Sequence, residues 1–254
     1  MSLKDEISVF NKAKLSAITG ETEVWDRVIY PHVIRKREIE IILGQIEQVK
    51  PRRVLDFGCG AGWLSKFLSS KGYHCVGVDV TSSLIKSATT HSSNNSQFVI
   101  GDCMNLPFQD GSFDFVVGVG ILHHLDPKQG LAECYRVLSR KGTLLLMEPN
   151  KFSPLGALGR RIAPLDTHTP GEQPLSPTEL KHILLQTGWI IEHTGYMFPY
   201  SFALAQVLRK TKLDRQGLRG ICGPLEASER LFEKIPFFNS LSWTIVVEAK
   251  KKLL

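Results

Sequence analysis

The chain has 254 residues, of which 43% are hydrophobic and 22% charged, and its net charge is +6. These values are typical of one large globular domain, alone or with a small cap, and no stretch of about 18 apolar residues predicts a membrane span. The first ten residues lack the apolar core of a signal peptide. The five cysteines are odd in number and include no CxxC pair, so we expect neither a disulfide framework nor a metal site. A cytoplasmic protein is therefore expected.

The positive charge is concentrated in the C-terminal part of the chain. Residues 1–150 hold 17 Lys and Arg against 16 Asp and Glu, whereas residues 151–254 hold 14 against 9. This excess is typical of a solvated surface with a basic tail. It also fits a face that binds nucleic acid, an acidic substrate or an anionic membrane surface, so peripheral membrane contact is one expectation.

An alternation of strands and helices follows an N-terminal helical region. Residues 24–48 carry apolar residues at helical spacing, and Pro31 is expected to break or kink this helix. Five short apolar strands then alternate with helices, which predicts a parallel sheet covered on both faces. The strands are predicted at 53–57, 75–78, 97–100, 113–119 and 143–147, and the helices at 63–71, 82–89 and 130–138.

The pattern is less regular after residue 149. Residues 150–176 are rich in proline and glycine, which predicts a long loop of the kind that forms a lid or binding segment. Ser176, Pro177 and Glu179 have the spacing of a helix start, and Gly188 ends that helix. The remaining elements are predicted as strands at 189–194 and 242–249 and helices at 202–212 and 226–235.

The most informative segment joins the first strand to its helix. Gly58, Gly60 and Gly62 stand at alternate positions, where glycine lets the backbone turn sharply and a ligand approach closely. A dinucleotide fingerprint would need its third glycine one residue later, where Trp63 stands. Asp56, at the strand end, would repel a pyrophosphate and attract a cation such as an α-ammonium group; capping of the following loop is the alternative role for this carboxylate.

A second carboxylate, Asp79, ends the next strand. A carboxylate in this position can accept hydrogen bonds from both hydroxyls of a ribose, and NAD enzymes share this feature. Asp79 therefore predicts a nucleoside ligand without choosing between the classes that bind one.

With these residues the chain resembles the class I S-adenosylmethionine-dependent methyltransferases, in particular the small-molecule enzymes related to ubiquinone and menaquinone ring methyltransferases. The resemblance covers residues 50–150 and rests on 56–62, 77–79, Gly101-Asp102, 106–108, Phe113-Asp114, His123-His124, and 136–138 followed by Gly142. It implies a three-layer α/β, Rossmann-like fold with a mostly parallel seven-stranded sheet and helical cap insertions. We expect an N-terminal helical lid at 1–50 and a methyltransferase domain at 51–254, with cap segments at 150–175 and 196–241.

The resemblance also implies which residues bind S-adenosylmethionine, whose product after transfer is S-adenosylhomocysteine. At the methionine end, Asp56 lies near the ammonium group and Val119 offers its backbone carbonyl. The glycine loop lines the same end through Gly58, Cys59, Gly60 and Gly62.

At the nucleoside end, the resemblance assigns Asp79 to the ribose hydroxyls and Val80 to the adenine face. Asp102 accepts a hydrogen bond from the adenine amino group, and the backbone N–H of Cys103 lies near the ring.

Methyl transfer from a sulfonium is an in-line displacement, for which the protein positions the acceptor and excludes water. A general base is needed only when the acceptor must lose a proton. His123, after the fourth strand, is the candidate for this base, with packing inside its loop as the alternative. The other titratable groups in question are His124, Glu148, Asp166 and His168.

The expected acceptor is a small apolar or aromatic metabolite. No Asn/Asp-Pro-Pro-Tyr stretch follows the fourth strand, which argues against methylation of exocyclic amines. Trp25, Tyr30 and His168 are expected to bind the acceptor.

Three other functions remain open. The basic C-terminal half would suit an RNA or protein methyltransferase. The chain could also be a non-catalytic regulator that binds S-adenosylmethionine. A nicotinamide oxidoreductase is the most distant alternative, because Trp63 stands where that fingerprint needs glycine.

Overall fold

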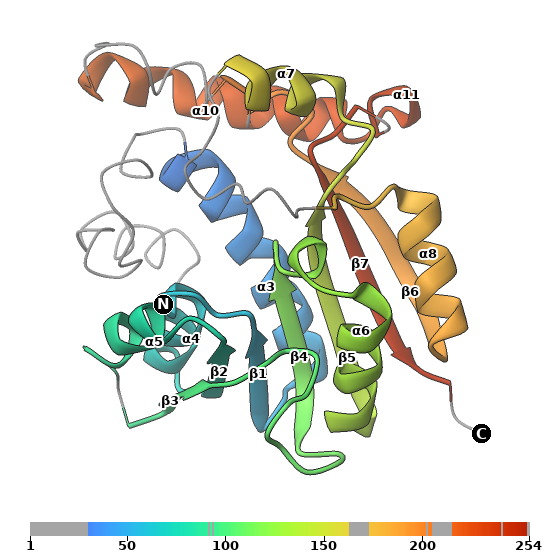
Figure 1. Ribbon diagram of the computed structural model, residues 1–254. Coiled ribbons are helices and arrows are strands. Elements are labelled where there is room, and N and C mark those ends of the chain that lie inside the picture. The colour runs from blue at the N-terminus through green and yellow to red at the C-terminus, as the bar shows by residue number, and fades with distance from the viewer. Residues whose placement is uncertain are drawn as a thin grey trace. The chain divides into compact units, whose positions relative to one another are not determined.

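The computed structural model describes residues 30–90, 92, 94–162, 173–201, 203–204, 215–239 and 241–252. The strands are β1 (Arg53–Phe57), β2 (His74–Asp79), β3 (Ser96–Ile100), β4 (Phe113–Val119), β5 (Leu138–Pro149), β6 (Trp189–Met197) and β7 (Thr244–Lys251). They form one seven-stranded sheet in the order β3-β2-β1-β4-β5-β7-β6 (Figure 1). The prediction of a mostly parallel seven-stranded sheet is confirmed.

The direction of the strands explains where a ligand can bind. The four pairs among β1 to β5 are parallel. Strands β6 and β7 are antiparallel, because Trp243 N–H donates to the Phe198 carbonyl at one end and Lys252 N–H to the Gly188 carbonyl at the other. The strand order reverses between β1 and β4, and in open α/β sheets ligands bind at the carboxyl edge of the strands where the order reverses.

The central strands are buried on both faces. Four of the five residues of β1 and five of the seven residues of β4 are buried, without the alternation of a half-exposed strand. Helices therefore cover the sheet on both sides. The helices and helical turns are η1 (Tyr30–Arg35), α3 (Lys36–Val49), α4 (Trp63–Ser70), α5 (Ser82–Thr89), η2 (Leu122–His124), α6 (Pro127–Val137), α7 (Pro154–Ile162), α8 (Pro177–Gln186), α10 (Arg215–Phe232) and α11 (Pro236–Asn239).

Helix α8 begins with the cap that its sequence predicts. The Ser176 hydroxyl accepts a hydrogen bond from Glu179 N–H, and the Glu179 carboxylate accepts one from Ser176 N–H. This reciprocal pair satisfies two backbone donors that have no partner within the helix. The kink expected at Pro31 falls in η1, a short π-helical segment that leads into α3.

The prediction of a continuous loop over residues 150–176 was wrong, because α7 lies within it. The Ser153 hydroxyl accepts from Gly156 N–H, and Pro154 occupies the first helical position, where its missing N–H costs nothing. Gly156 belongs to the helix for packing reasons, since a Cβ there would lie 2.1 Å from the Trp243 ring. Helix α10 likewise begins earlier than the predicted 226–235 and contains Pro224. Most of the helix predicted at 202–212 lies outside the described residues.

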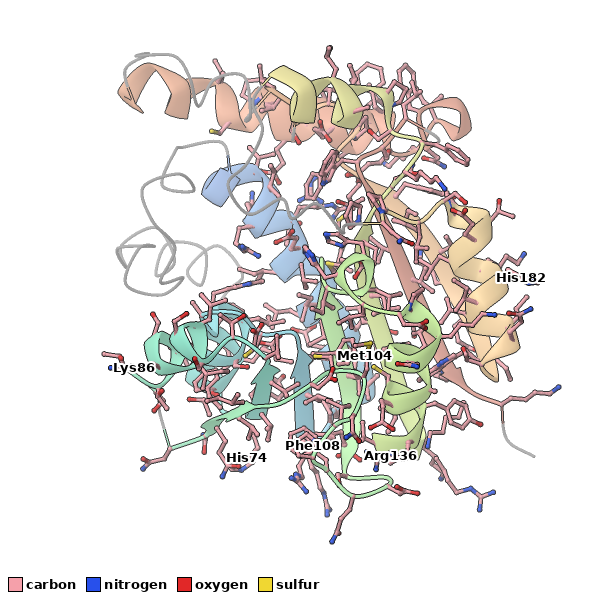
Figure 2. All side chains as sticks on the ribbon, viewed as in Figure 1. His74, Lys86, Met104, Phe108, Arg136 and His182 are labelled. Atoms are coloured by element: carbon pink, nitrogen blue, oxygen red, sulfur yellow. The ribbon has the colours of Figure 1, made fainter. Side chains whose placement is uncertain are left out.

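The loop after β3 is held in place by Arg136 of α6. Its guanidinium donates to the carbonyls of Leu106 and Phe108, and the neighbouring Glu133 accepts from Leu106 N–H. Figure 2 shows Arg136 and Phe108 where the loop passes the helix. The two parts of the family resemblance at 106–108 and 136–138 are thus in direct contact, and together they fix the segment that follows Asp102.

The chain divides into two compact units. One comprises residues 42–149, 171–195 and 245–254, and the other comprises residues 1–41, 150–170 and 196–244. The second unit thus contains most of the segments predicted as lid and caps. Their closure over an acceptor stays a prediction. Among the described residues, no helix combines the length and apolar character needed to cross a membrane.

Ion pairs join α3 to α10 and to the residue that follows it, within the second unit. Lys36 pairs with Glu226 at 2.6 Å, and Arg37 pairs with Glu233 at 2.9 Å. Between them on α10, Glu229 is only 3% exposed, and one of its oxygens accepts from the backbone N–H groups of Tyr200 and Ser201. Burial outweighs these hydrogen bonds and raises the pKa of Glu229 to about 7.

This carboxyl makes stability depend on pH. A glutamate in the unfolded chain loses its proton near pH 4.3, so between there and pH 7 the folded state binds more protons. The stability that Glu229 contributes to the folded state is therefore fully present below that range and is lost as the pH rises to about 7. Glutamine has no such titration. The free energy of unfolding of Glu229→Gln, taken relative to that of the original chain, should therefore be about 3 kcal/mol higher at pH 8 than at pH 5, since one pKa unit is worth about 1.36 kcal/mol.

Urea unfolding at the two pH values measures this gain. Glu226→Gln is the matched control on the same helix, because Lys36 and Arg230 outweigh burial and lower the pKa of Glu226 below this window. Its free energy difference from the original chain should be the same at pH 5 and pH 8. Parallel pH profiles for Glu229→Gln and the original chain would contradict the assignment.

Candidate cofactor and active site

The loop between β1 and α4 turns through three glycines in the left-handed region. Gly58, Gly60 and Gly62 have φ values of 75°, 53° and 77°. The backbone N–H groups of Gly58 and Cys59 donate to the Val78 carbonyl, which joins the loop to the neighbouring strand β2. The loop therefore lies at the carboxyl edge of the sheet, beside the point where the strand order reverses.

The three glycines differ in what surrounds them. A Cβ on Gly58 would lie 2.3 Å from the Ile121 side chain, and one on Gly62 would lie 2.4 Å from the Phe98 ring. Both glycines are thus required by packing as well as by φ. A Cβ on Gly60 would meet no atom within 4 Å among the described residues. The space beside Gly60 is therefore the part of the loop that a ligand can approach.

Asp79 ties the end of β2 to this loop. One carboxylate oxygen accepts from Gly60 N–H at 3.0 Å, and the other accepts from Thr81 N–H at 2.8 Å. A carboxylate oxygen has two lone pairs, so each keeps the capacity to accept one more hydrogen bond. Asp79 is therefore held in one orientation and can still bind two vicinal hydroxyls.

Two exposed apolar side chains flank Asp79. Val80 is 70% exposed and Ile100 is 58% exposed. The parallel register places Asp79 opposite Ile100, so both apolar groups stand at the carboxyl edge of β2 and β3. Such a surface fits the face of a planar heterocycle. Sequence reasoning named Val80 and missed Ile100, because the end of a predicted strand carries no sign of which face its last residue takes.

The next loop carries Asp102 and Cys103. The Asp102 carboxylate accepts from Met104 N–H at 2.8 Å, an arrangement that fixes the loop at its first residue. Cys103 is buried, and burial, followed by the charge of Asp79, raises the pKa of its thiol to about 12. The thiol therefore stays protonated at neutral pH and is no nucleophile.

Asp56 makes the loop-capping contact that was its alternative role. One carboxylate oxygen accepts from both the backbone N–H and the hydroxyl of Ser65, in the first turn of α4. The carboxylate is buried at this position, and its proximity to an ammonium group stays a prediction. Cys59 is buried too, and its sulfur occupies the space that a Cβ on Gly77 would fill.

His123 forms a buried pair with Glu148. The ring Nδ1 lies 2.9 Å from one carboxylate oxygen of Glu148, whose other oxygen accepts from the N–H groups of Ile121 and Leu122. The Cε1 edge of the ring lies next to Gly120, in the turn directly after β4. The pairing was not predicted, because Glu148 lies near the end of β5 and comes close to η2 only through the register of β4 with β5.

The other predicted residues are placed less fully. Val119 pairs with Met147 at the end of β4, and the use of its carbonyl stays a prediction. The His124 ring stacks on His123 with centroids 4.0 Å apart. Trp25, Asp166 and His168 lie outside the described residues, as does the side chain of Tyr30. Within the described part of the chain, no group of three His, Cys, Asp or Glu side chains could hold a metal ion.

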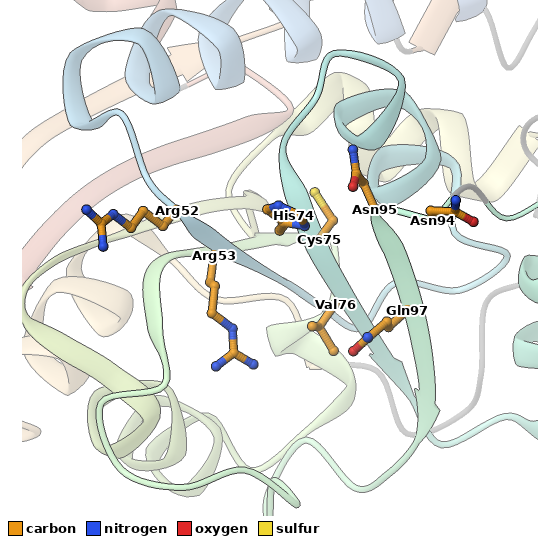
Figure 3. Close-up of a pocket in the computed structure, with 8 residues that line it drawn as sticks. All are labelled: Arg52, Arg53, His74, Cys75, Val76, Asn94, Asn95 and Gln97. Carbon is orange, nitrogen blue, oxygen red and sulfur yellow. The ribbon is translucent and has the colours of Figure 1, made fainter.

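A separate pocket of about 380 Å³ opens at the other end of the sheet (Figure 3). Its lining comes from the starts of β1, β2 and β3: Arg52, Arg53, His74, Cys75, Val76, Asn94, Asn95 and Gln97. The glycine loop follows the opposite ends of these parallel strands, so this pocket takes no part in the candidate cofactor site.

Comparison with known proteins agrees with this geometry. Residues 55–146 match a family model described as a methyltransferase domain. The demethylmenaquinone methyltransferase of Thermotoga maritima is 38% identical over 117 residues, which cover 45% of this chain and 49% of that protein. Residues 55–146 of the chain therefore form a methyltransferase domain. It spans about half the length of the curated relatives it matches.

Solved structures share the fold of nearly the whole chain. A putative sarcosine dimethylglycine methyltransferase from Galdieria sulphuraria superposes with a TM-score of 0.62 at 16% identity, covering 98% of each chain. The [4+2]-cyclase SpnF superposes with a TM-score of 0.59 at 17% identity, covering 99% of this chain and 95% of its own. A methyltransferase and a cyclase on one fold mean that the reaction must be argued from the site.

The residues of the methyltransferase domain fit S-adenosylmethionine, the cofactor of this class. Gly60 leaves space for a ligand beside the loop, and Asp79 keeps two acceptor positions. Val80 and Ile100 offer apolar surface next to that carboxylate.

Proposed function

We propose that the chain transfers a methyl group from S-adenosylmethionine to a small apolar or aromatic acceptor by in-line displacement. The observation that carries this proposal is Asp79, held by the glycine loop, beside the open space at Gly60 and the exposed Val80. In this assignment Asp79 accepts from the ribose hydroxyls, Val80 and Ile100 contact the adenine, and Asp102 accepts from its amino group.

The cofactor supplies a methyl group that is already activated as a sulfonium. The protein therefore needs to bind and orient both reactants and to exclude water. If the acceptor is a phenol or quinol, His123 takes its hydroxyl proton. Similarity to demethylmenaquinone methyltransferases supports a hydroxylated aromatic acceptor, the reduced form of a quinone that lacks a ring methyl group.

The assay that tests the proposal uses the whole chain with methyl-labelled S-adenosylmethionine. Short-chain demethylmenaquinol, simple phenols and bulk transfer RNA serve as candidate acceptors. We expect label in the quinol or phenol products, and none without protein. Label in RNA alone would favour the alternative of an RNA methyltransferase, which the basic C-terminal half supports.

Tight binding of S-adenosylhomocysteine without transfer to any acceptor would favour the other alternative, a non-catalytic regulator. A cytoplasmic setting and contact with an anionic membrane surface stay predictions from composition and charge.

A further inference from the structure

Glu148 presents a fixed pattern of acceptors to its surroundings. One oxygen accepts from two backbone donors, Ile121 N–H at 3.0 Å and Leu122 N–H at 2.8 Å. These donors cannot turn away, because both belong to the turn that leads into η2. The carboxylate is therefore locked, and its second oxygen is committed to the His123 ring.

This lock selects one tautomer of His123. A carboxylate oxygen can only accept, so Nδ1 at 2.9 Å must carry the proton that it donates. The neutral ring then has its lone pair on Nε2, and no hydrogen bond to Nε2 is seen among the described residues. The carbonyl of His123 accepts from Gln173 N–H at 2.9 Å, which holds the backbone of the same residue.

We propose that Glu148 is a positioning residue that keeps His123 in the Nδ1–H tautomer, so that Nε2 is the proton acceptor for a hydroxylated acceptor molecule. The proposal rests on the proposed function above. The acceptor O–H bond breaks and its proton goes to Nε2. In a phenol the oxygen electron pair then attacks the methyl carbon. In a quinol that lacks a ring methyl group, the oxygen pair forms a carbonyl bond and the ring π pair at the unsubstituted carbon attacks the methyl carbon; that carbon afterwards loses its proton to solvent and the carbonyl oxygen gains one, which restores the aromatic ring. The carbon–sulfur bond breaks and its electron pair stays on sulfur. An imidazolium, the methylated product and neutral S-adenosylhomocysteine remain, and the imidazolium charge lies against the carboxylate of Glu148.

Glu148→Gln reverses the tautomer while keeping the size of the side chain. The two backbone donors at Ile121 and Leu122 need an acceptor, so the amide oxygen takes their side. The amide NH₂ group then faces Nδ1 and must donate to it. The ring proton moves to Nε2, which can no longer accept a proton from a substrate. The variant thus reverses the direction of one hydrogen bond and removes the charge that faces the imidazolium, while the size of the side chain is kept.

Two-bond nitrogen–proton correlation spectra of histidine-labelled protein read the tautomer directly. We expect His123 with its proton on Nδ1 in the original chain and on Nε2 in Glu148→Gln. The rate of methyl transfer to a quinol should fall roughly 100-fold or more, the contribution of general base catalysis. The affinity for S-adenosylhomocysteine should stay within a factor of about two, since Glu148 holds the ring and not the cofactor loop.

Asp114→Asn is the matched control, because that carboxylate also accepts from two backbone N–H groups, those of Arg52 and Arg53, but stands at the starts of the strands. It should change neither the tautomer nor the rate. The proposal is overturned if His123 of the original chain carries its proton on Nε2, a result that needs no variant. It is also overturned if Glu148→Gln reverses the tautomer and transfers methyl groups to a quinol at the original rate.

The tautomer is read without any acceptor molecule. If no acceptor is methylated, the proposed function fails, while the spectra still decide whether Glu148 sets the state of His123. The two failures are therefore distinguishable.

Discussion

Replacement of Asp79 by Asn is expected to weaken the binding of S-adenosylhomocysteine by roughly 100-fold. Both carboxylate oxygens accept from the backbone, from Gly60 and Thr81, and asparagine offers only one acceptor. One backbone donor and one ribose hydroxyl therefore lose a hydrogen bond to a charged group. The backbone bond is missing from the free and the bound variant alike, so it lowers stability, and only the bond to the ribose hydroxyl enters the affinity. A hydrogen bond to a charged group is worth about 1.5 to 3 kcal/mol, and the upper end of this range corresponds to the predicted change.

Asp114→Asn is the control for this variant. The Asp114 carboxylate also accepts from two backbone N–H groups, those of Arg52 and Arg53, but it stands at the start of the strands rather than at their carboxyl ends. Titration calorimetry should show unchanged affinity in this control. Equal affinities for Asp79→Asn and the original chain would remove Asp79 from the cofactor site.

Alanine at two of the loop glycines is expected to separate folding from binding. Gly58→Ala should lower the free energy of unfolding by about 3 kcal/mol, because the left-handed backbone costs about 1 to 2 kcal/mol and the overlap with Ile121 adds a similar amount. Gly60→Ala has the same backbone cost without the overlap, so it should lose only about 1 kcal/mol.

The order is reversed for the cofactor. The Cβ of Gly60→Ala projects into the open space beside the loop, so the affinity for S-adenosylhomocysteine should fall at least roughly tenfold. Urea unfolding and calorimetry on both variants check the two effects. If Gly60→Ala binds the cofactor as well as the original chain, the open space at Gly60 is not where the cofactor lies.

The sequence was sufficient to predict the elements that local physics determines. The apolar run of β4 and the bounds of α5 were predicted to the residue, and the capping box of α8 formed as its spacing indicated. Each of these depends on residues close together in the chain. The glycine loop was predictable for the same reason, because the strand end, the turn and the helix start follow one another in the chain.

Features that depend on distant residues were not predictable. The sequence predicts a loop where α7 lies, because Gly156 and Gly159 disfavour a helix, and the Trp243 ring explains why glycine is needed at 156. The link between Glu148 and His123 depends on the register of two strands, which no local pattern specifies. The exposure of Ile100 was not predictable for the same reason, since it depends on where β3 ends beside β2.

The most direct test of the central claim is a calorimetric titration of the whole chain with S-adenosylhomocysteine, and separately with NAD. We expect one site per chain with a Kd in the micromolar range, corresponding to a binding free energy of about 8 kcal/mol, and no binding of NAD. Absence of S-adenosylhomocysteine binding would rule out the assigned cofactor site, and binding of NAD in its place would make this α/β domain a dinucleotide-binding one.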